Sequence, residues 1–525
     1  MQTLYFGGPI LTMTSPAYAE ALLVEDGRIL AVGGKGELLD RTAPDCRKVD
    51  LQGAALLPAF IDPHSHFSSV AMGFLQANIE EAVTAEEITE RIQRFIAEAA
   101  PEPGAWVQAR GYDHNVLPGA QHLPLSVLDA MAPDHPLLLA HQSGHCGLVN
   151  TLGLQALGLT PDTPDPEGGR YGRAADGSLT GYLEENAFMQ AQQKMPTPDP
   201  QALVGAYAKA QRLYASHGIT TMQEGMMVGG LVPLYQMLLA ANLLQLDVVA
   251  YPDAATWAAA KEKFSQTYQG HVRLGGIKMF LDGSPQGRTA WMRTPYTGTP
   301  DYCGYGTLTD EAVRAVLDLA AAEQVQVLAH CNGDAAAAQY LRALQQAEAE
   351  HPVLKTLRPV MIHAQLLHPD QLALAKEVGV VASFFVAHVY HWGDVHIRNF
   401  GPDRAALISP TASALRVGVP FTFHQDAPVI PPDMLETVWC AANRRTEAGV
   451  LLGPDERITA REALRAVTAT AAWQYFEEGD KGTLAPGKRA DLVVLDRDPL
   501  TTPPEDLRKV RVLQTVKDGQ TVFEA

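Results

Sequence analysis

Two histidines, His64 and His66, follow a short apolar run at residues 57–61. Along a β-strand, side chains two residues apart point to the same face, so both imidazoles can reach one metal ion. At the carboxyl end of a strand, this pair predicts the first ligands of a site in a (β/α)8 barrel. Taken alone, the pair is equally typical of a strand end with solvated or core histidines, so the rest of the chain has to decide.

The length and composition predict a large acidic globular protein. At 525 residues the chain exceeds one ordinary domain and fits a barrel of about 250 residues or more with a smaller module. Lys and Arg total 40 against 59 Asp and Glu, which gives a net charge of -19. Because no run of basic residues accompanies this balance, we expect neither a nucleic-acid nor a membrane partner.

The cysteines and the first residues favour a cytoplasmic location. The five cysteines are scattered and form no CxxC pair, which suits a reducing compartment. The first 14 residues lack the basic and apolar regions of a signal peptide. Residues 231–251 are the most apolar long stretch, but polar residues interrupt them, so they predict a helix followed by a buried strand.

Strand-like segments lie at both ends of the chain. Alternating apolar residues and turn residues predict strands at 3–6, 21–24, 28–32, 490–495, 510–516 and 521–523. Each set of strands is too small to fold alone. We therefore expect one small β-sandwich built from residues 1–57 and 479–525.

The residues between these ends alternate helix-like and strand-like segments. Amphipathic helices are predicted at 88–99, 203–217 and 310–323. This alternation predicts an α/β fold, a TIM-like (β/α)8 barrel over residues 58–478. Residues from about 67 to 200 fit the barrel poorly and are rich in Pro, Gly and Asp, so we expect them to form an insertion over the active face.

Four further candidate ligands close apolar runs where barrel strands should end. They are Lys278, His330, His363 and Asp426. A lysine within an apolar strand is costly unless its charge is removed or paired, although an ion pair would also explain Lys278. Each residue alone is weak evidence, but four of them, spaced by one or two βα units, predict a metal site.

The ligand order HxH, Lys, His, His, Asp resembles the amidohydrolase superfamily. Residues 278–290 resemble the K-x-F-x-D-G-S-x-x-x-R-T-A segment of its family 3, the branch that includes N-substituted formamide deformylases. Residues 111–115 resemble the GWDxN-like loop of that branch. Further matches lie at residues 144–145, 218–221, 390–394, 426–429 and 482–492. The resemblance covers nearly the whole chain, and it also implies a homodimer.

The resemblance implies a role for each candidate ligand. His64 and His66 would bind the more buried metal, and His330 and His363 would hold a second one. Lys278 would be carboxylated on its side-chain nitrogen and bridge the two metals; without that modification, the site would hold one metal or use Glu224 as the bridge. These ligands favour Zn²⁺ or a similar first-row ion, so we expect one or two divalent ions per chain.

The implied metal suggests the chemistry. A bound metal lowers the pKa of water to near 7, so hydroxide could attack an amide carbonyl at neutral pH. Asp426 would act as general base and then as general acid toward the departing amine. We therefore expect a metal-dependent amidohydrolase that cleaves a C–N bond of an N-formyl, N-acyl or related small-molecule amide. Its predicted catalytic residues are Asp426, Lys278 and His363.

Other residues are candidates for contact with the substrate. The candidates in the insertion, Tyr112, Asp113 and His145, could equally serve ordinary loop packing. Arg288 could bind a carboxylate by its fork geometry or anchor its own loop by pairing with Asp282. Trp392 offers a flat apolar wall, and His424 stands where relatives often have glycine. The candidates are Tyr112, Asp113, His145, Arg288, Trp392 and His424.

Two other functions fit the same fold. A deaminase or a cyclic-amide hydrolase could use the same barrel, but Lys278 and the absence of a His-x-x-Glu motif after His330 argue against a mononuclear deaminase. A non-catalytic scaffold could also keep the hydrolase fold, since fold does not imply function. Every expected ligand position is filled, which argues against the scaffold.

Overall fold

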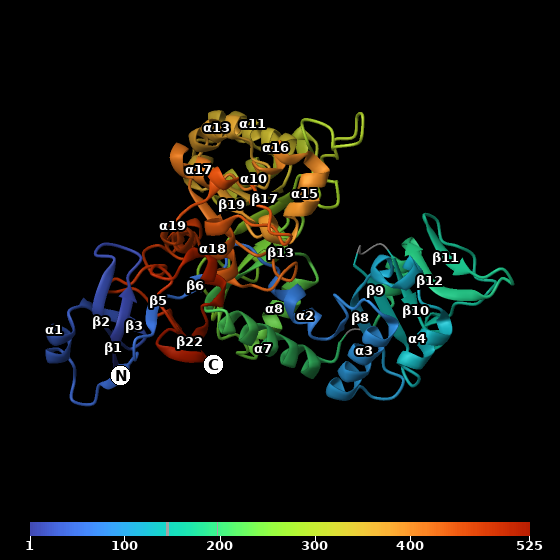
Figure 1. Cartoon of the computed structure of the whole chain (residues 1–525), viewed down its shortest axis with the longest axis horizontal. Coiled ribbons are helices and arrows are strands. Elements are labelled where there is room, and N and C mark those ends of the chain that lie inside the picture. The colour runs from blue at the N-terminus through green and yellow to red at the C-terminus, as the bar shows by residue number, and fades with distance from the viewer. Residues whose placement is uncertain (143–145, 197) are drawn as a thin grey trace. The chain divides into compact units, whose positions relative to one another are not determined.

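The computed structural model describes residues 1–142, 146–196 and 198–525. Its contacts divide the chain into two compact units. Unit 1 comprises Met1–Phe67 and Gln211–Ala525, and unit 2 comprises Ser68–Ala210. The strands and helices of both units are labelled in Figure 1. The division into three ranges expected from the sequence stays a prediction.

In unit 1, an eight-stranded sheet contains strands from both ends of the chain. Its order is β23-β22-β21-β5-β1-β2-β3, with β4 paired to β1. Figure 1 shows β1–β3 in blue and β22 in red, the colours of the two ends of the sequence. The link is the antiparallel pair β5–β21, in which Leu57 lies opposite Val493. The strands are β1 Gln2–Leu11, β2 Tyr18–Glu25, β3 Arg28–Gly33, β4 Arg47–Asp50, β5 Ala55–Pro58, β21 Leu492–Leu495, β22 Val512–Lys517 and β23 Gln520–Glu524.

The sequence predicted these terminal strands and the turn between β2 and β3. Asp26 and Gly27 form that turn with φ of 46° and 80°, backbone angles that glycine and aspartate tolerate best. Leu22, Leu56 and Leu492 are fully buried in one hydrophobic core of this sheet. The helix α1 Lys35–Asp40 packs its Leu38 into a second core. The finer expectation of a β-sandwich stays a prediction.

Parallel strands form the rest of unit 1. One sheet has the order β15-β14-β13-β6 and another the order β16-β17-β18-β19-β20. A parallel bridge between Asp253 and Lys278 connects the two series. The strands are β6 Phe60–Ile61, β13 Ile219–Met227, β14 Asp247–Pro252, β15 Val272–Leu274, β16 Gly276–Phe280, β17 Gln326–Cys331, β18 Val360–His363, β19 Val381–Phe384 and β20 Phe421–Phe423.

Helices alternate with these parallel strands, as the sequence predicted. The apolar stretch at residues 231–251 is a helix followed by the buried strand β14, and the helix predicted at 310–323 has those bounds. Among the described residues, every helix falls short of the length and apolar content needed to cross a membrane. The helices are α2 Phe67–Gly73, α7 Pro200–Ser216, α8 Leu231–Ala240, α9 Trp257–Lys261, α10 Asp310–Glu323, α11 Asp334–Glu350, α12 Val353–Thr356, η3 Pro369–Gln371, α13 Leu372–Glu377, α14 His388–His391, α15 Gly393–Phe400, α16 Pro402–Ala405, α17 Thr411–Val417, α18 Met434–Asn443, η4 Pro454–Glu456, α19 Ala460–Ala466, α20 Ala469–Gln474 and η5 Pro504–Lys509.

Unit 2 has a six-stranded sheet of its own, in the order β11-β12-β10-β9-β8-β7. Two hydrophobic cores pack against it, with Leu128, Leu137 and Phe188 fully buried. The sequence predicted a helix here at 88–99 but not the sheet. The elements are β7 Ala77–Asn78, α3 Ala85–Ala99, β8 Val107–Tyr112, η1 His114–Val116, η2 Pro118–Ala120, α4 Leu125–Met131, β9 Leu137–His141, β10 Cys146–Val149, α5 Thr151–Leu157, β11 Gly169–Arg173, β12 Leu179–Glu185 and α6 Asn186–Gln193.

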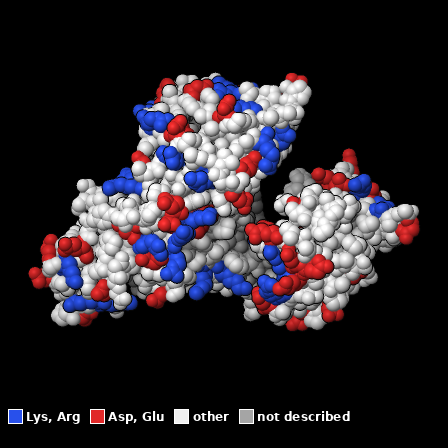
Figure 2. All heavy atoms as spheres, viewed as in Figure 1, with Lys and Arg blue, Asp and Glu red and all other residues white. Residues whose placement is uncertain are grey.

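Charged side chains cover the surface without separating by sign. On the face shown in Figure 2, blue Lys and Arg are interspersed with red Asp and Glu. This distribution accompanies the net charge of -19.

A buried ion network joins the sheet of both chain ends to the parallel strands. Lys481 Nζ lies 2.6 Å from Asp247 Oδ2 and 2.8 Å from Glu477 Oε2. Lys517, in β22, lies 2.9 Å from the same Asp247 oxygen and 3.0 Å from Asp491. The side chains of Lys481 and Asp247 are each 1% exposed, so neither charge has water as an alternative partner.

We predict that Lys481→Met destabilises the protein by about 3–5 kcal/mol, because it leaves buried carboxylates without their cation. Urea denaturation monitored by circular dichroism measures the change. The control is Lys261→Met, which breaks the exposed ion pair with Glu323 at 2.6 Å and should cost no more than about 1 kcal/mol. Equal losses in the two variants would show that the network does not stabilise unit 1.

Candidate metal centre

Three of the predicted ligands converge where β6 and β20 end. His64 and His66 follow β6, and Asp426 follows β20. Asp426 Oδ1 lies 3.4 Å from Nε2 of His64 and 3.4 Å from Nε2 of His66. The ligand atoms of the three residues lie within 4.8 Å of one another. The carboxyl ends of parallel strands share one edge, so residues far apart in sequence meet there.

The other three predicted ligands adjoin this group. Lys278 Nζ lies 3.2 Å from His64 Nε2. His330 Nδ1 lies 3.1 Å from His363 Nε2, and that His363 nitrogen lies 3.8 Å from Asp426 Oδ2. The structure therefore brings all six predicted ligands together. Whether each of them binds a metal stays a prediction.

Gln223 fixes the orientation of the His64 ring, a contact that the sequence analysis missed. Its Nε2 donates to the Pro63 carbonyl at 2.8 Å and to the Tyr475 hydroxyl at 2.8 Å. Its Oε1 is therefore the atom that lies 2.6 Å from His64 Nδ1. Because an amide oxygen only accepts, Nδ1 carries the ring hydrogen. The lone pair of His64 Nε2 then points toward Lys278 and Asp426.

His330 is oriented in a similar way. The Gly283 carbonyl accepts from His330 Nε2 at 3.1 Å and from Asn332 Nδ2 at 2.8 Å. A carbonyl oxygen has two lone pairs and no hydrogen, so it can take both bonds. This leaves His330 Nδ1 as the nitrogen that faces His363. The sequence offered no signal for a backbone carbonyl in this role.

His424 lies behind His363 rather than on an open surface. Its Nε2 is 3.2 Å from His363 Nδ1, and its Nδ1 is 3.0 Å from Ser383 Oγ. Its side chain is fully buried. His424 can thus accept the Nδ1 hydrogen of His363, the kind of outer contact that orients metal ligands. This arrangement differs from the predicted contact of His424 with a substrate.

Burial sets the protonation of the centre. It lowers the pKa of His330 to about 4 and holds the pKa of His64 and of His363 well below the ordinary value. These rings are therefore neutral at pH 7, the form that binds metals. Burial also lowers the pKa of Lys278 to about 7, so much of its amine is uncharged at neutral pH.

Asp426 keeps its charge in the same environment. Burial alone would raise its pKa, but the neighbouring His66, His424 and Lys278 outweigh that effect and place the pKa below its ordinary value. The buried Oδ1 atom has no hydrogen-bond partner among the described residues. An ionised oxygen that is buried without a donor is costly, and a cation would compensate it.

Two of these residues have a strained backbone. His363 has φ of 70° and Asp426 has φ of 54°, in the left-handed region that residues with a side chain rarely adopt. Each such conformation costs on the order of 1–3 kcal/mol and is concentrated at functional sites. The strain thus marks the strand ends where the side chains turn toward the cluster.

Trp392, one of the predicted substrate contacts in unit 1, lies in a group of aromatic rings. Trp392 is half-buried, with its ring 4.5 Å from His388 and 6.0 Å from Phe385. Phe385 in turn contacts His424, ring to ring at 5.3 Å. A row of aromatic rings therefore connects Trp392 to the cluster, which supports its role as an apolar wall.

The expected pairing of Arg288 with Asp282 is wrong. The Asp282 carboxylate accepts three backbone N–H groups, from Trp291, Asn332 and Gly333. Arg288 donates instead to the Thr297 carbonyl at 2.6 Å. The guanidinium therefore holds a different part of the loop.

The remaining predicted contacts belong to unit 2. Tyr112 is 1% exposed in a hydrophobic core, and its hydroxyl accepts from the Leu123 N–H at 3.1 Å, so little of it is left for a substrate to touch. Asp113 caps the short helix η1 by accepting from Asn115 N at 2.9 Å. His145 lies outside the described residues. A role in substrate binding stays a prediction for these residues.

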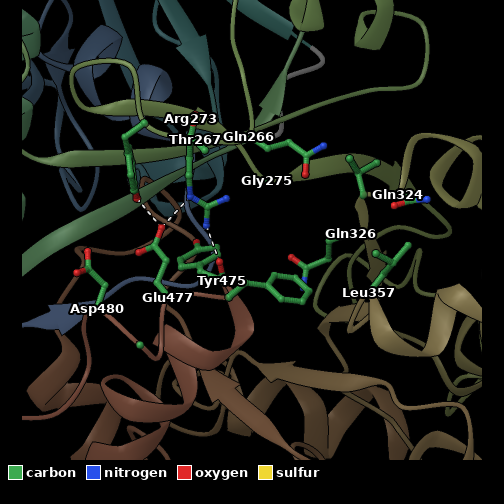
Figure 3. A pocket seen from close by; sticks show the side chains of 14 residues that line it. Gln266, Thr267, Arg273, Gly275, Gln324, Gln326, Leu357, Tyr475, Glu477 and Asp480 are labelled. Atoms are coloured by element: carbon green, nitrogen blue, oxygen red, sulfur yellow. Dashed lines mark hydrogen bonds and ion pairs between the residues drawn. The ribbon is translucent and has the colours of Figure 1, made fainter. Parts of the chain in front are cut away.

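A cavity of about 600 Å³ lies at the opposite ends of the strands. Gly275 and Gln326, which line it, stand at the beginnings of β16 and β17. Figure 3 shows Arg273 pointing toward Glu477 and Tyr475 in this cavity. Arg273 Nε donates to Glu477 at 2.7 Å. Because barrel enzymes work at the carboxyl ends of their strands, the ligand cluster and not this cavity is the candidate active site.

Comparison with known proteins assigns the family. Residues 47–523 match the amidohydrolase family, in the branch numbered 3. The chain belongs to this family, which confirms the resemblance found in the sequence. Family and fold together define a member of the amidohydrolase family with a TIM-barrel-type fold.

Individual relatives align with nearly the whole chain. An N-substituted formamide deformylase from Arthrobacter pascens is 26% identical over 521 residues, which cover 96% of this chain and 95% of that protein. YtcJ from Bacillus subtilis (strain 168), provisionally an amidohydrolase, is 27% identical and aligned over 100% of both chains. An uncharacterised metal-dependent hydrolase from Pyrococcus furiosus is similar in structure, with a TM-score of 0.78, 24% identity and coverage of 95% and 100%.

We predict that Gln223→Leu weakens metal binding by about 10–100-fold, because His64 loses the acceptor that orients it. Metal titration followed by isothermal calorimetry measures the change. The matched control is Gln326→Leu, which removes a buried amide of β17 that donates to Arg358 and Gln474 carbonyls at 2.8 and 3.0 Å. Equal metal affinity in the two variants would contradict the role of Gln223.

Proposed function

We propose that this protein hydrolyses the C–N bond of a small-molecule amide, such as an N-formyl or N-acyl amine, at a centre for one or two divalent metal ions. The convergence of His64, His66, Lys278, His330, His363 and Asp426 carries this proposal. Zn²⁺ is the ion that we expect, because histidine and carboxylate ligands favour it.

The residues of the centre fit a metal ion. The imidazoles of His64, His330 and His363 are neutral, the lone pair of His64 faces inward, and the buried Asp426 Oδ1 has no hydrogen-bond partner among the described residues. His64, His66 and Asp426 would hold one ion, and His330 with His363 would hold a second. Bound there, a divalent metal supplies activated water at neutral pH and polarises a carbonyl group.

Asp426 is the proposed general base and acid. Its carboxylate is ionised, so it can accept a proton from the water that adds to the amide carbon. The same carboxyl group then donates that proton to the nitrogen as the C–N bond breaks, and an amine and a carboxylic acid leave. Positioned proton transfer of this kind contributes about 10²–10⁴-fold to the rate.

Lys278 is proposed to act as a carboxylated residue. Its amine is fully buried, and burial lowers its pKa to about 7, so the nucleophilic neutral form is present at physiological pH. Addition of carbon dioxide to the neutral amine gives a carbamate and releases one proton. The product is an anionic ligand in place of a cation, which suits the cluster of ligands around it.

Two observations support an N-formyl substrate. The deformylase from Arthrobacter pascens aligns with 96% of this chain. Trp392 is half-buried and contacts the buried Phe385 beside His424, so its ring is the part suited to an apolar N-substituent. A homodimer and a cytoplasmic location remain expectations from the sequence.

A substrate panel tests the proposal. The panel contains N-formyl and N-acyl amines, with an aromatic amine, a cyclic amide and a purine as comparisons. We expect amine release from the formyl or acyl compounds by metal-loaded protein and at least about 10²-fold less by Asp426→Asn. Turnover of the cyclic amide or the purine alone would contradict the proposed substrate class. Equal rates for Asp426→Asn and wild type would contradict the proposed role of Asp426 in proton transfer.

We predict that Lys278→Ala lowers the metal bound at the centre of unit 1 from about two ions to one or none, because the bridging anion is lost. Inductively coupled plasma mass spectrometry counts the metal. Added acetate or propionate should restore part of the metal and activity, since a small carboxylate fits the space of the carbamate. Lys261→Ala, at an exposed site, serves as the control. Unchanged metal content in Lys278→Ala would exclude Lys278 as a ligand.

A further inference from the structure

Unit 2 has a second group of convergent metal-binding side chains. The strands β8 and β9 are parallel, and Tyr112 lies opposite His141 in their register. Asp113 and His114 come directly after β8, and His141 is the last residue of β9. Parallel strands that end at one edge place these three side chains together, although the sequence separates them by 27 or 28 residues.

The donor atoms have the spacing of ligands around one ion. His114 Nδ1 lies 3.3 Å from His141 Nε2, and that His141 nitrogen lies 3.5 Å from Asp113 Oδ1. The ligand atoms of all three residues lie within 4.8 Å of one another. Donors bound at about 2.0–2.1 Å in a tetrahedron lie about 3.3–3.4 Å apart, so two of the three edges already have this length.

Neighbouring groups hold the donors in place. Asp113 Oδ1 accepts from Asn115 N at 2.9 Å and from Asn115 Nδ2 at 2.8 Å, and Gln142 donates to the other oxygen. The two oxygens of a carboxylate offer about four lone-pair positions, so one position of Asp113, on Oδ2, remains for a cation. The His114 ring stacks on His122 at 4.0 Å, which limits its rotation.

The environment is partly dry. The side chains of His141 and Asp113 are 9% and 14% exposed. Two of the three donors are therefore largely shielded from water.

We propose that Asp113, His114 and His141 bind one Zn²⁺ or similar first-row divalent ion in unit 2. Two imidazole nitrogens and one carboxylate oxygen form a set of borderline ligands of the kind that this ion prefers. Three protein ligands leave the fourth position to water or to a small anion. All three ligands belong to unit 2, so this proposal does not depend on the proposed function.

Zinc stoichiometry of the full-length protein tests this site. Wild-type protein and the variants His114→Ala and His141→Ala are dialysed against micromolar Zn²⁺, and bound metal is counted by mass spectrometry. We expect each variant to hold one ion fewer per chain than the wild type. His135→Ala, which removes a histidine of unit 2 bonded to the Ala105 carbonyl at 3.0 Å, should keep the wild-type number. Equal zinc in all four proteins would overturn the proposal.

Two further variants separate a lost ligand from a lost fold and from the other centre. Asp113→Asn keeps the turn with Asn115 but removes the charge, and we expect Zn²⁺ affinity to fall at least about 10-fold with an unchanged circular dichroism spectrum. The triple variant His64→Asn/His66→Asn/Asp426→Asn should retain the ion of unit 2. If that triple variant binds no Zn²⁺ while remaining folded, unit 2 has no metal site of its own.

Discussion

The hydrogen bond between Gln223 and His64 determines which ring nitrogen of His64 points into the candidate metal centre. The Gln223 amide is held by the Pro63 carbonyl and the Tyr475 hydroxyl, so it can present only its oxygen to His64 Nδ1. The opposite ring nitrogen must therefore turn its lone pair toward Asp426 and Lys278. If the amide were reversed, an N–H group would point into the cluster and repel a cation. Ligand residues alone do not make this site, because their tautomers have to agree.

The same topological rule operates in both units. In unit 1, His64 and Asp426 are separated by most of the barrel sequence, yet they are 3.4 Å apart because their strands end at one edge. In unit 2, His114 and His141 follow two adjacent parallel strands and lie 3.3 Å apart. Residues at the carboxyl ends of parallel strands thus become neighbours.

Much of the centre in unit 1 could be predicted because each ligand closes an apolar run, a pattern that sequence shows directly. Gln223 could not be predicted, since its role depends on which neighbour takes each end of its amide. The role of His424 depends on a ring-to-ring contact with His363 that no spacing reveals. The sheet of unit 2 was missed because four of its strands, β8, β10, β11 and β12, contain Gly and the segments between strands are rich in Pro and Gly, so turn-rich composition concealed regular pairing.

The sheet that contains both ends of the chain has a consequence for synthesis on the ribosome. Strand β5 ends at Pro58, but its antiparallel partner β21 begins only at Leu492. At about 5–20 residues per second, this separation corresponds to roughly 20 to 90 seconds. During that interval one edge of β5 lacks its native partner, and such edges associate readily with other chains. The nascent chain is therefore the form of this protein that most needs protection from aggregation.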